Sequence, residues 1–153
     1  MKELASKSIC HETLHNRQVQ SRQKLNSQNL TILETVTDWT ARRVYPEFLA
    51  SLGGKARFTQ EIIKNAPSYS DLVTNFDALR NALGIADDAA TLAHFRNVID
   101  TVDERLYGSA VVEFFAKTGN KKIAKKDINL LLGAIDTAPS IFIGYVKQIL
   151  GKP

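Results

Sequence analysis

Five lysines stand close together between residues 117 and 126, with no acidic residue among them: Lys117, Lys121, Lys122, Lys125 and Lys126. Residues 67–116, directly before them, contain three arginines and eight aspartates or glutamates. Such a separation of charge favours a charged partner, because like charges within one segment repel each other. Clustered ammonium groups bind phosphates with little sequence preference and strong salt dependence. The cluster therefore predicts contact with the phosphates of DNA or RNA, although a solvated loop without a role would have the same composition.

Other charged residues extend this hypothesis or offer an alternative to it. Arg17, Arg22 and Lys24 lie in a basic N-terminal segment and are expected to assist the lysines in binding nucleic acid. The acidic residues Asp100, Asp103 and Glu104 suggest a different partner. The basic loop of one copy could dock on the acidic helix of a neighbouring copy, which would make the protein a self-assembling or protein-interaction module.

The sequence contains no pattern of a familiar catalytic class: it lacks a Gly-rich phosphate loop, HExxH, GxSxG and CxxC. Cys10, His11 and His15 are close in sequence, and the two histidines would share one face of a helix. A structural zinc site needs four ligands, however, and the only other histidine is His94. We therefore expect a non-enzymatic protein with no cofactor and no metal site.

Apolar residues recur every three or four positions over most of the chain, and Gly and Pro stand between these runs, which predicts an all-α fold. Residues 1–30 carry few apolar anchors, so we expect a flexible basic arm there. Residues 31–153 are expected to form a single compact domain of five to seven helices. Its core should contain the largest apolar side chains of the periodic stripes: Trp39, Phe48, Phe76, Leu79, Phe95, Val102, Phe114, Leu131 and Phe142.

Helix boundaries follow from capping residues, glycines and prolines. Thr31 and Glu34 have the spacing of a capping box, which predicts a helix start at Thr31, and Pro46 should end or kink that helix near Val44. Further helices are expected over about 59–66, 70–83, 87–118, 125–135 and 139–150. Gly108 lies inside the longest of them, so a kink or a close approach by another helix is expected there.

Composition also bears on the compartment. A single cysteine cannot cross-link the fold, and no secretory signal is evident, so we expect an intracellular, non-secreted protein. The most apolar stretch, residues 128–146, is interrupted by Asp136 and Pro139. An aspartate in the middle of a bilayer costs roughly 3 kcal/mol, so two buried helices are expected here and no membrane span.

The segment from Phe114 to Ile128 resembles two known helix–loop–helix patterns. As an EF-hand, its loop would run from Ala116 to Asp127, but Lys121 takes the place of the required glycine and the lysines would repel Ca²⁺. As a histone fold, residues 119–128 are similar to the basic loop and the start of the third helix, and the expected short, long and short helices over 70–135 match. That resemblance implies a DNA-wrapping role, although residues 84–88 are acidic where a first basic loop would stand.

Overall fold

The computed structural model describes residues 2–151, which form eight α-helices and one 3₁₀ turn without a β-strand. The elements are α1 (Lys2–His15), α2 (Ser27–Ser51), α3 (Thr59–Asn65), α4 (Ser70–Ala82), α5 (Ala89–Thr101), η1 (Glu104–Leu106), α6 (Tyr107–Thr118), α7 (Lys125–Gly133) and α8 (Pro139–Leu150). The predicted all-α class is confirmed, and the helices number eight because α1 lies in the segment predicted to be a flexible arm. Within the described part of the chain, no helix has the length and apolarity needed to cross a bilayer.

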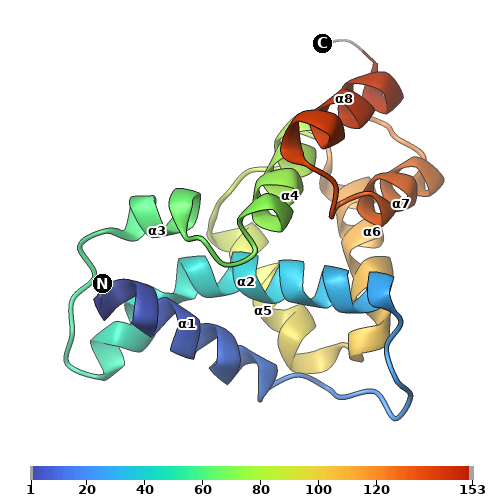
Figure 1. The fold of residues 1–153 in the computed structure, drawn as a ribbon. Helices are drawn as coiled ribbons and strands as arrows, with labels where there is room; N and C mark the ends of the chain where they lie inside the picture. Colours follow the sequence, from blue (N-terminus) through green and yellow to red (C-terminus); the bar gives the residue numbers. More distant parts are fainter. Residues whose placement is uncertain (1, 152–153) are drawn as a thin grey trace.

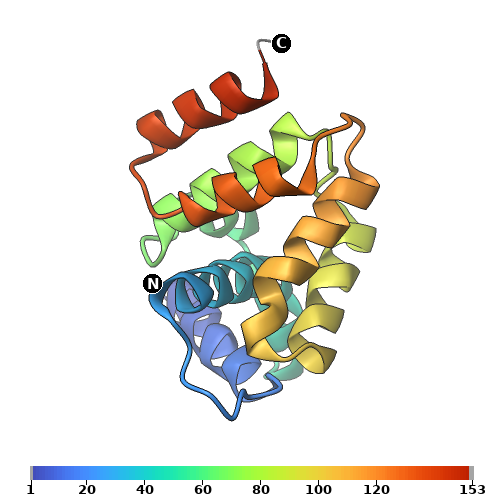
Figure 2. The same ribbon diagram turned by 90° about the vertical axis from the view of Figure 1, so that its right-hand side faces the viewer.

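The long helix α2 crosses the middle of the molecule, and most other elements pack against it (Figure 1). Helix α1 lies along α2, while α3, α4, α5 and α6 contact it from other directions. Helix α8 packs on α4 and α7 and lies far from α1 (Figures 1 and 2). The N-terminal and C-terminal helices therefore form opposite ends of the molecule.

The core is built around an aromatic cluster. Trp39, Phe76 and Phe95 meet edge to face with ring centroids 5.3–5.9 Å apart, a favourable arrangement for aromatic rings. The other buried members of the predicted core are Leu79, Leu131 and Phe142. The remaining three, Phe48, Val102 and Phe114, are partly buried and pack against this core.

Helix α2 begins earlier and runs further than the sequence predicts. Its N-cap is Asn26, whose side chain accepts a hydrogen bond of 2.7 Å from the backbone N–H of Asn29. Thr31 therefore lies inside the helix, and the predicted capping box is wrong. The helix also continues through Pro46 to Ser51. Tyr45, directly before the proline, is completely buried, so tertiary packing holds the backbone helical where the local preference opposes it.

The helix predicted over residues 87–118 is broken in two. Val102 has an extended backbone, and the Asp103 side chain accepts a hydrogen bond from the backbone N–H of Arg105 to start η1. The N–H of Glu104 donates to the carbonyl of Val19, so the segment after α1 stabilises the break. The long central helix required by the histone-fold resemblance is therefore absent.

Gly108 lies at a close contact between helices, as expected. A Cβ at this position would lie 3.2 Å from Cδ1 of Ile32 on α2, so α6 approaches α2 closely here.

The N-terminal segment differs from the predicted flexible arm, because residues 2–15 form a helix docked on α2. Cys10, Leu14, Lys7 and His11 of this helix are buried. Glu3 fastens its first turn by accepting hydrogen bonds from the backbone N–H groups of Arg57 and Phe58 and from the Tyr45 hydroxyl. The docking surface is largely polar, which explains why apolar periodicity did not reveal it.

Candidate phosphate-binding surface and buried polar cluster

The lysine loop, residues 117–126, joins α6 to α7 at the end of the molecule that carries α8 (Figures 1 and 2). Its base is fixed to the end of α4, since the N–H of Asn120 donates to the carbonyl of Leu83 over 2.9 Å. Gly84 has a φ of +71°, and a Cβ there would lie 2.2 Å from the Asn120 side chain. The loop is thus anchored at Asn120, while its lysines point away from the core.

All five lysines of the loop are exposed. Of these five lysines, only Lys125 forms an ion pair with another residue of the described chain, residues 2–151. Its partner is Glu113 at 2.5 Å, and both side chains are more than half exposed. Such exposed pairs contribute less than about 1 kcal/mol and dissociate readily. The positive charge of the loop is therefore accessible to an external anion.

The start of α7 adds to this positive surface. The N-cap residue Ala124 offers no side-chain hydrogen bond to the free N–H groups of the first turn. Lys125 and Lys126 follow at the first two helical positions, where the helix dipole already favours negative charge. Lys147 of α8 lines the same groove as Lys121, beside apolar side chains such as Ile143. An anion at the start of α7 would meet Lys125, Lys126 and backbone N–H groups, beside the carboxylate of Asp127 in the same turn.

The other basic residues predicted to assist do not join this surface. Arg17, Arg22 and Lys24 lie in the segment between α1 and α2, at the opposite end of the molecule from the loop between α6 and α7 (Figures 1 and 2). Arg17 is also paired with Asp100 at 2.7 Å. A ligand held by the lysine loop would have to cross the molecule to reach them.

The three acidic residues of the alternative interface are used within the chain. Asp100 pairs with Arg17, and Asp103 pairs with Arg105 at 3.1 Å. The Glu104 carboxylate accepts a hydrogen bond of 3.0 Å from the backbone N–H of Ser21. The contacts of Asp100 and Glu104 fasten the segment that follows α1 to the break between α5 and α6, and the Asp103–Arg105 pair lies within that break.

A second cluster of functional groups is buried between α1 and α2 and centres on Asp38. Its carboxylate accepts hydrogen bonds from Lys7, from Nδ1 of His11 at 3.0 Å and from Nε of Arg42 at 2.8 Å. Lys7, Asp38 and Arg42 are all almost completely buried. Burial raises the pKa of Asp38, but the hydrogen bonds from its three partners outweigh burial and lower the pKa overall. Asp38 is therefore ionised and is paired with two buried cations, Lys7 and Arg42, of whose two positive charges it offsets one.

Arg42 connects this cluster to the segment between α3 and α4. Its guanidinium donates to the carbonyls of Ile63, Ala66 and Ser68 over 2.7–3.1 Å. Tyr69 follows with a φ of 53°, a left-handed conformation that is unfavourable for a tyrosine. Its ring stacks on the imidazole of His11, with centroids 5.4 Å apart and an interplanar angle of 12°. The segment thus places an aromatic ring against one face of His11.

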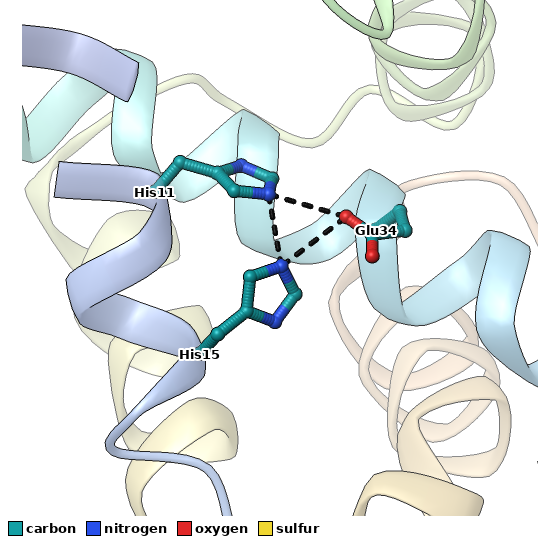
Figure 3. A group of neighbouring side chains, drawn as sticks. All are labelled: His11, His15 and Glu34. Atoms are coloured by element: carbon teal, nitrogen blue, oxygen red, sulfur yellow. Dashed lines mark hydrogen bonds and ion pairs between the residues drawn. The ribbon is translucent and has the colours of Figure 1, made fainter. Parts of the chain in front are cut away.

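His11 and His15 lie one turn apart on α1 and meet Glu34 of α2 (Figure 3). Their Nε2 atoms are 2.9 Å apart and lie 3.1 and 3.2 Å from Oε2 of Glu34. Hydrogen bonds with His11 and His15 outweigh the effect of burial and lower the pKa of Glu34 to about 2. Despite burial, contacts with Asp38 and Glu34 raise the pKa of His11 to about 9, and the bond with Glu34 raises that of His15. The three groups therefore surround a position that attracts positive charge.

The spacing of His11 and His15 predicts one shared helix face, but it gives no indication of Glu34 as a third member of the group. The position of Glu34 three residues after Thr31 suggested a helix cap, which hid its contact with a helix 19 residues earlier in the chain. Cys10, the third residue considered for metal binding, is buried in the apolar core and is not part of this group.

The chain matches no family model, and neither the curated proteins nor the solved structures include one similar enough to count as a match. Its function is therefore inferred from its own side chains.

Proposed function

We propose that the protein is a non-enzymatic nucleic-acid-associated or assembly subunit that binds phosphate backbones through the lysine loop. The observation that carries this proposal is the exposure of all five lysines on one anchored loop, with a single weak ion pair among them in the described chain. The ligand is a polyanion of closely spaced phosphates, because one or two isolated phosphates would leave most of the ammonium groups without a partner.

The loop supports binding without sequence preference. Lysine ammonium groups are flexible point charges that contact phosphates and do not read the edges of bases. Of the two phenylalanines of α6 before the loop, Phe115 is buried in the core, and Phe114 stacks on His94 with centroids 3.9 Å apart. Its ring is therefore engaged within the fold and is not offered to an unstacked base. Contacts limited to lysines and the first turn of α7 would discriminate poorly between sequences.

Docking of the loop on the acidic residues of another copy is the less supported alternative. Asp100, Asp103 and Glu104 already have partners within the chain, and although exposed pairs of this kind are weak, Arg17 and Arg105 offset part of the negative charge that an incoming lysine would meet. Nucleic acid is not affected by these pairs, since the phosphates bring their own negative charge to a free positive surface.

Chemical footprinting of the lysines tests the proposed surface. The protein is acetylated briefly with and without a duplex of about 20 base pairs at ~50 mM salt, where electrostatic binding is strong. Mass spectrometry should show slower acetylation of Lys117, Lys121, Lys122, Lys125 and Lys126 in the complex.

Three exposed lysines elsewhere, Lys2, Lys55 and Lys64, serve as internal controls and should react at unchanged rates. Protection of these three to the same extent as the loop would show that binding follows overall charge. Unchanged reactivity of the loop in a complex that demonstrably forms would contradict the proposed site.

A further inference from the structure

The cluster of His11, His15 and Glu34 is not used by the proposed phosphate-binding surface. It lies between α1 and α2, while the lysine loop lies at the other end of the molecule (Figures 1 and 2). An inference from its geometry is therefore independent of the proposed function.

The hydrogen bonds around the two histidines define which ring nitrogen carries a proton. Nδ1 of His11 faces the ionised carboxylate of Asp38, so it must donate. Nδ1 of His15 lies 2.9 Å from Oε1 of Gln18. The amide of Gln18 is oriented in turn by its own donation to Oγ1 of Thr37 over 2.7 Å, and the Thr37 hydroxyl donates to the carbonyl of Leu33. Both Nδ1 atoms are therefore N–H donors.

With Nδ1 protonated in both rings, the two Nε2 atoms face each other and Glu34. In neutral imidazoles, the two Nε2 lone pairs would face each other at 2.9 Å and also face a carboxylate oxygen of Glu34. Three electron pairs so close together repel unless a cation lies among them. If both rings instead carried a proton on Nε2, each could donate to Glu34, but the two N–H groups would lie against each other with their nitrogens 2.9 Å apart, whereas one metal ion can bind all three atoms.

The spacing of the three atoms fits one metal ion. Zinc binds histidine nitrogen and carboxylate oxygen at about 2.0–2.2 Å. An ion about 2.1 Å from each atom would see the observed separations of 2.9, 3.1 and 3.2 Å at angles of roughly 87–99°, nearer the ~90° of three ligands on one face of an octahedron than the ~109° of a tetrahedral zinc site. The hydrogen bonds from Nδ1 to Asp38 and Gln18 are the outer contacts that usually orient metal-binding histidines.

We propose that His11, His15 and Glu34 bind one divalent transition-metal ion of the Zn²⁺ type. Two histidines and a carboxylate leave at least one coordination position open, and the His15 and Glu34 side chains are 22% and 20% exposed, so water can reach the ion. Glu34 is one of the three ligands, and the other permanent charges beside it, those of Lys7, Arg42 and Asp38, sum to +1. This net positive charge opposes the ion, so we expect a Kd above about 1 μM and below about 1 mM.

Calorimetric titration of the untagged, metal-free full chain with Zn²⁺ tests this proposal, and Co²⁺ absorption spectroscopy reports the ligand set. One ion should bind per chain. Glu34→Gln and His15→Ala each remove one of three ligands and should weaken binding at least ~100-fold. Gln18→Met removes no ligand but takes away the acceptor that orients His15, together with the hydrogen bond to Thr37, and should weaken binding ~10-fold. His94→Gln, a histidine change outside the cluster, should leave the Kd unchanged.

Circular dichroism and urea unfolding without metal establish whether each variant folds. If a variant does not fold, a measurement on the unmodified chain still tests the proposal. Zn²⁺ should protect His11 and His15, and not His94, from acylation by diethyl pyrocarbonate. The absence of saturable binding below about 1 mM, or equal binding by His15→Ala and the unmodified chain, would show that protons alone occupy the cluster and would overturn the proposal. None of these variants changes the lysine loop, so failure here leaves the phosphate-binding proposal standing.

Discussion

Replacing Lys121, Lys122, Lys125 and Lys126 by glutamate is expected to weaken binding to duplex DNA at least ~100-fold at ~50 mM salt, because each lost ammonium removes the release of one counterion and each added carboxylate repels phosphate. The fold should be retained. All four side chains are exposed, and acidic residues at the start of α7 suit the helix dipole better than lysines. Fluorescence anisotropy with labelled duplex measures the affinity, and circular dichroism checks the fold.

A matched variant distinguishes the effect of where the charges lie from the effect of the total charge on DNA affinity. Glutamate at Lys2, Lys24, Lys55 and Lys64 also changes the formal net charge from +4 by eight units to −4, again at exposed positions. It should reduce the affinity by less than ~10-fold, since it leaves the lysine loop intact. Equal losses in the two variants would mean that DNA responds to total charge and that the loop is not the binding surface.

The second large effect is expected at the buried ion cluster. Asp38→Asn should lower the free energy of unfolding by about 3–5 kcal/mol, because Lys7 and Arg42 are almost fully buried and would lose the negative charge with which both are paired. For a chain of this length, 3 kcal/mol corresponds to a fall in Tm of roughly 6–12 °C. Urea unfolding monitored by Trp39 fluorescence measures the change.

Asp100→Asn is the control for this prediction, since it makes the same chemical change at an ion pair that water reaches. Its partner Arg17 is 54% exposed, so the expected loss is below about 1 kcal/mol. A loss at Asp38 as small as that at Asp100 would contradict the view that Asp38 holds α1 and the segment after α3 on α2.

The helices with apolar stripes could be predicted from the sequence, and the polar contacts could not. Helices α3, α4, α7 and α8 lie close to their expected ranges because Gly84, Pro139 and regular apolar spacing determine them locally. Helix α1 has no such stripe. It docks through Glu3, Lys7 and His11, whose partners lie on other elements and leave no periodic signal.

The same difference between local patterns and contacts across elements explains why one candidate site could be predicted from the sequence and the other could not. The lysine loop is a local cluster, so its residues are visible in the sequence, and the structure adds only their exposure and their distance from Arg17, Arg22 and Lys24. The metal-binding group joins His11 and His15 to Glu34 across two helices. With α1 interpreted as a flexible arm, nothing in the sequence could bring the carboxylate to the histidines.

A salt series of DNA affinity tests the central claim most directly. If the five loop lysines neutralise about four phosphates, the logarithm of the association constant should fall linearly with the logarithm of the salt concentration with a slope near −3.6, which means ~150-fold weaker binding at ~200 mM than at ~50 mM salt. Unrelated duplexes should give the same slope. Undetectable binding at 50 mM salt, or an affinity that salt does not change, would contradict the claim that this loop binds phosphate backbones.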